Sequence, residues 1–317
     1  MVKVAMPSSL GGAAPQWGEA DWRAYGLLLF MGTAWGLSLS TMKLAGAAGG
    51  HPVGMALWMV TVSGSMLLLA SLVVFRPSWP RLAVLRFCAI CGACGVAFPG
   101  TVLFWSAQHL PAGVVALAFA VMPLLTYGLS VVFRVEAGQA ARLFGVVIGL
   151  AAMLLVILPK GALPDPGAAL WVCITLVASL SMAFENFYAG GFRPPDANSL
   201  QLSCGRQLGA VFLLAPIVTF TGTAVPLFTS WGSLQWMTSL SGVLSGLAYT
   251  AMLTVIRTAG PVFASQAAYL ITLTGVAWGM LIFDERHSLF VWVALAMTLL
   301  AIAMVRPRRP RNIARLL

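Results

Sequence analysis

The stretch ITLTGVAWGMLIFDERHSLFVWVA, residues 271–294, joins two apolar runs through one short charged turn, Asp284 to His287. A helix needs about 20 apolar residues to cross a bilayer, and both runs continue beyond the stretch to about that length. The pattern predicts a hairpin of two membrane-crossing helices. The whole chain has the same character, with 60% hydrophobic and 8% charged residues, whereas soluble domains carry about 25% charged residues.

Similar apolar runs recur along the chain, which predicts an all-α integral membrane protein with ten transmembrane helices. The predicted spans are 24–43, 53–75, 83–107, 111–133, 141–159, 166–190, 197–219, 233–256, 261–283 and 288–305. The connections between them are too short for a separate soluble domain, so we expect a compact bundle.

The basic residues orient the predicted spans. An even number of spans places both termini on one side, and fourteen of the 18 basic residues then share that side. Lys43, Lys160 and Arg286 lie on the other side, and Arg206 lies within a span. Cytoplasmic loops are the ones enriched in Lys and Arg, so the bias predicts that both termini are cytoplasmic. We expect the membrane to be the inner (plasma) membrane. Such placement argues against nucleic-acid binding as the reason for the net charge of +10.

The quoted hairpin has a counterpart in the first half of the chain. A shift of 149 residues (271 minus 122) lays MPLLTYGLSVVFRVEAGQAARLFG, residues 122–145, over it and aligns Glu136 with Glu285. Because each unit has an odd number of spans, the second unit enters the membrane from the opposite face, which predicts an inverted repeat. The predicted segments are a cytoplasmic start (1–23), two five-helix units (24–160 and 161–305) and a basic cytoplasmic tail (306–317). The tail is interpreted as a topology anchor, with binding to anionic lipid headgroups as the alternative.

Three stretches carry a resemblance to a known family. They are GTAWGLSLSTMKLA (32–45), HLPAGVVALAFAVMPLLTYGLSVVFRVE (109–136) and RTAGPVFASQAAYLITLTGVAWGMLIFDERHS (257–288). With them the chain resembles the EamA-type family of the drug/metabolite transporter superfamily over nearly its whole length. The resemblance implies ten helices, cytoplasmic termini, a central cavity and export or exchange of small metabolites. The chain departs from the family pattern at Leu57-Trp58, where an arginine is common, and near Thr272, where a proline is expected.

Motifs of other protein classes are incomplete. Cys88, Cys91 and Cys94 have the spacing of an iron–sulfur motif, but Phe98 stands where the fourth cysteine would be, so we interpret them as small helix residues. Three histidines at span ends (51, 109 and 287) are interpreted as solvated rather than metal ligands. The sequence lacks a phosphate-binding glycine loop and a nucleophile–base set. We therefore expect no enzyme activity, no cofactor and no metal site, and the sequence assigns no oligomeric state.

Polar residues spaced three, four or seven apart share one face of a helix, and such faces should turn away from lipid. These faces, with nearby aromatic residues, predict the lining of a substrate cavity. The predicted lining residues are Trp35, Ser40, Trp58, Trp105, Tyr127, Tyr188, Tyr249, Gln266, Tyr269 and Trp278. For each aromatic residue, packing or a place in a headgroup belt is the alternative.

Glu185 and Arg206 are charged residues inside predicted spans, where a charge is costly. The hairpin between these spans turns near Pro194–Pro195, so the two side chains should come within reach of each other. Two interpretations stand: a pair that couples transport to a proton or gates the cavity, and a structural pair or snorkelling side chains near the interface.

The sequence as a whole predicts a secondary transporter that exports or exchanges a small amphipathic metabolite, such as an amino acid, by alternating access. A cavity with little fixed charge argues against multiply anionic substrates. The alternatives are proton-coupled uptake and, less favoured, a membrane scaffold or enzyme that transports nothing.

Overall fold

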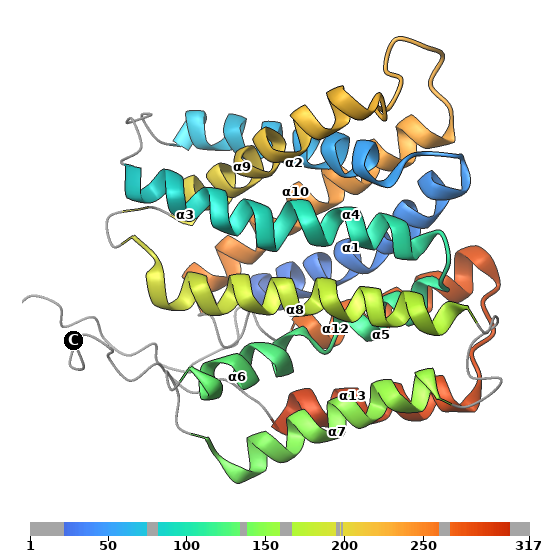
Figure 1. Ribbon diagram of the computed structural model, residues 1–317. Helices are drawn as coiled ribbons and strands as arrows, with labels where there is room; N and C mark the ends of the chain where they lie inside the picture. The colour runs from blue at the N-terminus through green and yellow to red at the C-terminus, as the bar shows by residue number, and fades with distance from the viewer. Residues whose placement is uncertain are drawn as a thin grey trace, which may run out of the picture.

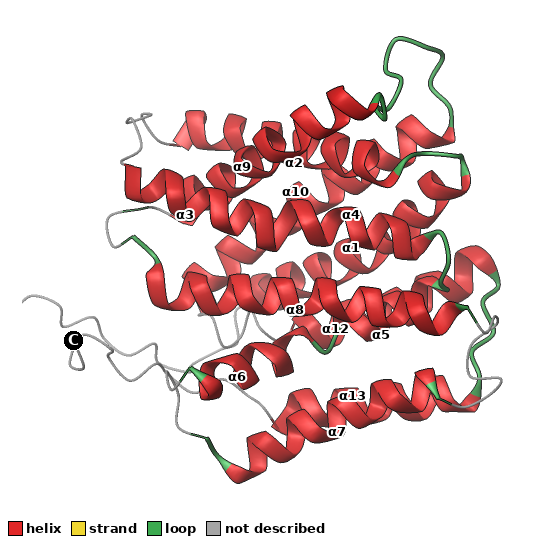
Figure 2. Cartoon of the chain, viewed as in Figure 1, coloured by secondary structure: helices red, strands yellow, loops and turns green. Residues whose placement is uncertain are grey.

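The computed structural model describes residues 22–74, 82–133, 138–158, 167–194, 197, 199–259 and 267–304. Within these ranges the regular structure is entirely helical (Figures 1 and 2). The segment 1–21, the tail beyond residue 304 and the positions Glu136 and Gln266 lie outside the described residues.

In the first half, α1 is Trp22–Ala47 and α2 is Pro52–Val74. The third predicted span consists of α3 (Leu82–Gly92), the π-helical turn η1 (Ala93–Ala97) and α4 (Phe98–Ala107). The fourth consists of α5 (Ala112–Phe119) and α6 (Met122–Val132), and the fifth is α7 (Ala140–Ile157).

In the second half, α8 is Ala168–Phe192, α9 is Ser199–Thr221 and α10 is Ser233–Ala259. The quoted hairpin of the sequence is formed by α12 (Ala267–Phe283) and α13 (Leu289–Met304). In the described residues, seven helical stretches are long and apolar enough to cross a membrane, and α12 and most of α13 are shorter apolar helices. The chain is therefore a helical membrane protein.

Two predicted spans are not continuous α-helices, and a proline follows each interruption. Pro99 stands near the start of α4, directly after η1, and Pro123 near the start of α6. Proline lacks the backbone N–H of a regular helix and its ring clashes with the preceding turn, so the helix is broken or rewound there. The fourth span is interrupted between Phe119 and Met122, two residues that line a cavity.

The helices pack in pairs drawn from both halves of the chain. α2 lies against α9, α7 against α13, and α1 against both α10 and α12. Glycines allow the closest approaches: a Cβ atom at Gly36 of α1 would lie 2.8 Å from the backbone nitrogen of Gly275 on α12. Helices in lipid associate through such close backbone contact, because apolar burial gives no driving force between them there.

The bundle has two ends, which we name by their connections. The distal end carries the connections 48–51, 108–111, 222–232 and 284–288, and it lies at the right in Figure 1. The opposite, proximal end is where α8 ends and α9 begins, at the left in Figure 1.

Candidate functional site

A cavity of about 480 Å³ extends from the middle of the bundle towards its proximal end. Every helical span contributes to its wall except the last: α1, α2, the η1–α4 segment, α5, α6, α7, α8, α9, α10 and α12. Most of the lining is apolar, with a few polar groups among it. A cavity of this size and character fits a small metabolite.

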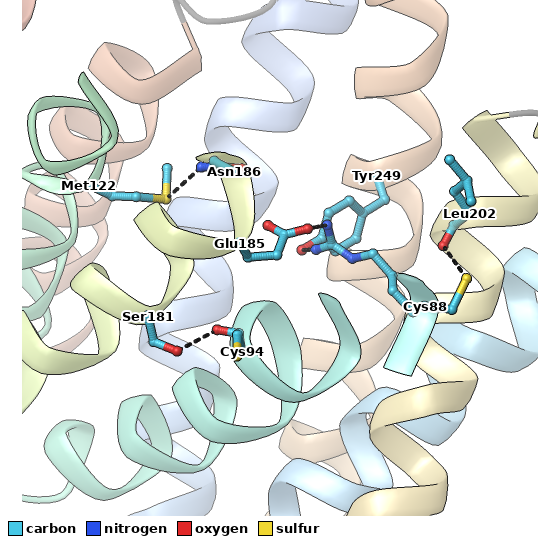
Figure 3. A network of polar contacts seen from close by, with 9 residues as sticks. Cys88, Cys94, Met122, Ser181, Glu185, Asn186, Leu202 and Tyr249 are labelled. Atoms are coloured by element: carbon cyan, nitrogen blue, oxygen red, sulfur yellow. Dashed lines mark hydrogen bonds and ion pairs between the residues drawn. The ribbon is translucent and has the colours of Figure 1, made fainter. Parts of the chain in front are cut away.

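The polar centre of this cavity is an ion pair between neighbouring helices. Arg206 Nη1 on α9 lies 3.0 Å from Glu185 Oε1 on α8, and Glu185 is 3% exposed. The Arg206 guanidinium also lies 4.7 Å from the centre of the Tyr249 ring, and its Nη2 donates a hydrogen bond to the Tyr249 hydroxyl (Figure 3). The contact expected between Glu185 and Arg206 is present, and because Glu185 is buried it does not snorkel to solvent.

The π-helical turn η1 gives Glu185 its space. A Cβ atom at Gly95 would lie 2.5 Å from Glu185 Cγ, so only glycine allows the turn to pass so close to the carboxylate. Ser181, one turn earlier on α8, donates a hydrogen bond of 2.7 Å to the carbonyl oxygen of Cys94 in η1 (Figure 3). π-Helical turns within α-helices frequently occur at functional sites. Here the turn packs against Glu185, the one carboxylate in the described part of the cavity lining.

A second guanidinium group enters the cavity at its proximal end. Arg142, at the start of α7, is buried and lies 5.4 Å from the centre of the Tyr127 ring. The described lining therefore holds two arginines and one glutamate, a net charge of +1. By its position in the sequence, Arg142 is one of the fourteen basic residues predicted on the cytoplasmic side, and no pattern predicts it in the cavity.

The structure brings six of the predicted site residues to this cavity: Trp35, Tyr127, Tyr249, Tyr269, Glu185 and Arg206. Trp35 and Tyr249 meet edge to face, with ring centroids 5.1 Å apart. Gln266 lies outside the described residues.

The remaining predicted residues are not among those that line the cavity. Ser40 is fully buried in α1, and Trp58 Nε1 donates a hydrogen bond of 2.8 Å to Ser239 Oγ of α10. Trp105 is half exposed and packs against Trp171, and Tyr188 stacks on Phe87 of α3. Trp278 lies on α12, half-buried. Trp58, Trp105 and Tyr188 thus contact other helices, as expected for packing residues and not for residues that line a cavity.

Several residues that line the cavity were not predicted from the sequence. Five are methionines (Met42, Met59, Met122, Met182 and Met252), and the polar ones include Asn186 and Gln207. Methionine carries no signal that separates a cavity wall from a packed core. Gln207 had a detectable signal, because it lies four residues after Ser203 and thus on the same face of α9.

A second polar cluster lies at the distal end of the bundle. Lys43 Nζ of α1 donates a hydrogen bond of 2.6 Å to Glu285 Oε1, in the connection between α12 and α13. The same carboxylate accepts hydrogen bonds from the backbone nitrogens of Ala112, at 2.7 Å, and Gly113, at 3.2 Å, in the first turn of α5. A carboxylate is favoured there by the unpaired N–H groups and the positive end of the helix dipole. We call Lys43, Glu285 and the first turn of α5 the distal cluster.

His287 lies next to the distal cluster and is buried, contrary to the expectation of a solvated side chain. Its Nε2 is 3.6 Å from Glu285 Oε2, too long for a hydrogen bond. Burial lowers the pKa of His287, the charge of Lys43 lowers it further, and Glu285 opposes the change. Among the described residues, no cluster of three or more His, Cys, Asp or Glu side chains could hold a metal ion.

Comparison with known proteins identifies the family of this chain. The model of the EamA-like transporter family matches the chain twice, at residues 22–158 and 169–306. The chain belongs to the EamA-like transporter family. As a member of this family it is a transporter and not an enzyme.

Two further comparisons agree with this assignment. The chain is 26% identical over 291 residues to the uncharacterized inner membrane transporter YedA of Escherichia coli (strain K12), covering 89% of this chain and 90% of YedA. YedA from Escherichia coli O157:H7 matches with the same values. A protein of known crystal structure shares the fold, with a TM-score of 0.59 and 16% identity over 90% of this chain and 96% of the other.

Proposed function

We propose that this EamA-family transporter exports or exchanges a small amphipathic metabolite, an amino acid or a related compound, by alternating access. The observation that carries the proposal is the cavity itself, in which the Glu185–Arg206 pair and the Tyr249 ring lie within a wall of thioether and aromatic side chains. Such a wall suits an apolar body, and the charged pair suits a substrate with both an acidic and a basic group. A single excess positive charge suits one carboxylate better than several phosphates.

The contacts between helices support an inverted repeat of five-helix units. In such a repeat, each span of the first unit corresponds to one span of the second. The corresponding pairs are α1 and α8, α2 and α9, the α3–α4 span and α10, the α5–α6 span and α12, and α7 and α13. The contact of α1 with α10 then becomes that of α8 with the α3–α4 span, and the contact of α1 with α12 becomes that of α8 with the α5–α6 span. The contacts of α2 with α9 and of α7 with α13 map onto themselves. This exchange is what a two-fold axis between two related units produces, and rocking of such units is the basis of alternating access.

The same proposal assigns a direction to the two ends of the bundle. With the proximal end cytoplasmic, as the basic residues predict, the cavity lies in the cytoplasmic half and the distal cluster seals the outer side. An outward-facing state then requires that the contacts of Glu285 with Lys43 and α5 separate. In this arrangement both termini are cytoplasmic and the membrane is the inner membrane.

Counterflow in proteoliposomes tests the proposal. Liposomes that contain the purified protein and are loaded with one unlabelled amino acid should accumulate the labelled compound transiently and saturably. The panel covers aromatic, thioether and small neutral amino acids, with a sugar phosphate as the compound that should not be transported. If folded protein moves no compound of the panel, the proposed substrate class is excluded.

An imposed pH gradient separates export or exchange from the alternative of proton-coupled uptake. Glu185 is the residue proposed to carry a coupling proton, because it is the carboxylate of the described cavity lining. Uptake driven by external acid would favour the alternative, whereas counterflow that is independent of the gradient favours exchange.

A further inference from the structure

Gln207 is a buried polar side chain in the lining of the cavity. It lies directly after Arg206 on α9, is 2% exposed and contributes to the cavity lining. Among the described residues its Oε1 has no hydrogen-bond partner. Arg206 uses its two terminal nitrogens for Glu185 and Tyr249, and its Nε likewise has no partner there.

Such atoms need an explanation, because buried polar groups are nearly always hydrogen-bonded. An amide in a packed core could be replaced by an apolar side chain, and the surrounding wall is already rich in methionine. The Gln207 amide instead lies in the cavity lining, where a ligand can pair with it once the amide rotates to turn its oxygen towards the cavity.

The packing of α9 positions this part of the helix firmly. A Cβ atom at Gly64 of α2 would lie 3.3 Å from Gln207 Cβ, and a Cβ atom at Gly92 of α3 would lie 2.6 Å from the carbonyl oxygen of Arg206. Two neighbouring helices thus contact α9 at these residues through glycine. The backbone is held in place while the amide can rotate about its last torsion and present either its oxygen or its nitrogen.

We propose that Gln207 binds the ammonium group of a neutral amino acid, so that it selects such substrates over carboxylic acids without an amino group. This inference rests on the proposed function and names the recognition element of the same cavity. With the amide rotated so that its oxygen faces the cavity, Gln207 accepts a hydrogen bond from the ammonium group, and the positive charge of Arg206, which also lines the cavity, attracts the carboxylate. The side chain of the substrate lies against the methionines and against the Trp35–Tyr249 pair.

Gln207 is expected to act on the selectivity between substrates with and without an amino group. A site that hydrogen-bonds a polar group of its substrate rejects an analogue that lacks the group, since the partner in the protein is then left unpaired. An apolar residue at position 207 removes this penalty. The preference for the amino acid over its deaminated analogue should therefore fall by about tenfold or more.

The test compares phenylalanine with 3-phenylpropionate in counterflow, for the wild-type protein and for Gln207→Met and Gln207→Leu. In both variants we expect KM for phenylalanine to rise by about tenfold, while KM for 3-phenylpropionate stays constant or falls. The conservative variant Gln207→Asn should recover part of the preference. Gln108→Leu is the matched control, because this glutamine donates to the carbonyl oxygen of Gly50 at the distal end and does not line the cavity.

The outcomes separate the two proposals. If the wild-type protein shows saturable counterflow of neither compound nor of any other amino acid, the proposed function fails. If it transports phenylalanine and the Gln207 variants keep the wild-type preference, Gln207 does not bind the ammonium group and this inference is overturned. A monodisperse size-exclusion profile of each variant shows that a loss of preference is not a loss of folding.

Discussion

Lys43 Nζ lies 2.6 Å from Glu285 Oε1, although 242 residues separate them in the chain. The contact joins α1 of the first half to the connection between α12 and α13 in the second half. Because Glu285 is almost completely buried and also caps α5, three segments of the distal end meet at one carboxylate. The distal end is therefore held by polar contacts, and it lies opposite the Glu185–Arg206 pair of the cavity.

Lys43→Met should loosen the distal end. It removes the cation but leaves Glu285 buried, and loss of one partner of a buried hydrogen bond costs about 1–3 kcal/mol. Hydrogen exchange of the backbone amides of Ala112 and Gly113 should then be faster by about tenfold or more. Lys43→Arg keeps the charge and serves as control. Equal exchange rates in Lys43→Met and wild type would show that the distal cluster does not depend on Lys43.

Gly95→Ala should displace Glu185. The added Cβ atom would lie 2.5 Å from Glu185 Cγ, in the middle of the side chain, so the carboxylate must move away from Arg206. We expect the counterflow rate to fall by about tenfold, the effect of roughly 1.4 kcal/mol. Gly100→Ala is a matched control in the same span and the same cavity lining, because the nearest atom to its Cβ would be Met59 Cε at 3.6 Å. Similar losses in both variants would contradict a specific role for the space at Gly95.

Glu185→Gln should change the pH dependence of transport. The variant removes the one carboxylate of the described cavity lining and leaves Arg206 buried without its counter-charge, a cost of about 3 kcal/mol. We expect slower flux whose rate no longer varies between about pH 5 and 8. Glu185→Asp keeps the charge and should retain the pH dependence. A Glu185→Gln profile that matches the wild type in rate and shape excludes proton coupling through this residue.

A charge exchange between Glu185 and Arg206 tests the pair itself. Each single reversal, Glu185→Arg or Arg206→Glu, places two like charges side by side and should abolish both stability and transport. The double variant restores opposite charges, although the Arg206 contact with Tyr249 is lost. Recovery of stability without transport would assign the pair a structural role. Recovery of both would show that transport requires the attraction between the two opposite charges, whichever helix carries each.

The buried His287 should make the folded protein sensitive to acid. Burial lowers the pKa of His287. The folded state therefore binds this proton at lower pH than the unfolded chain, in which histidine has a pKa of about 6.5. The unfolded state therefore binds more protons below that pH, and stability is lost as the pH falls through about 6.5. Thermal unfolding followed from pH 8 to 5 should show a smaller decrease for His287→Gln than for the wild type. His109→Gln, at an exposed position, is the control, and an equal decrease in all three proteins would exclude His287 as the cause.

Much of the fold could be predicted because apolar length and charge bias act locally. Helices lie at each predicted span in the described residues, and the family assigned from short motifs is the one whose model matches the chain. The interruptions at Pro99 and Pro123 were not predicted, since proline in a membrane helix kinks, breaks or leaves it intact according to the neighbours that satisfy the freed backbone groups.

The candidate site could be predicted only in part. Glu185 and Arg206 were detectable because a charge in an apolar span must find a partner. Arg142 and Gln207 were not selected, although both line the cavity. Trp58 and Tyr188 were selected, but they pack against residues of other helices. Aromatic type and helical periodicity identify a face that avoids lipid, and they do not distinguish a packed interface from an open wall.

The amino-acid sequence by itself determined that this protein is a bundle of membrane-crossing helices, because the chain has too few polar groups to cover a surface in water. Only the tertiary structure decided where the cavity lies and where polar contacts join the helices at the distal end. The cavity depends on how α1, α8, α9 and α10 meet, and the distal cluster depends on Lys43 and Glu285 reaching the same turn of α5 from opposite halves of the chain. Both arise from contacts between segments far apart in sequence, and no local pattern specifies such contacts.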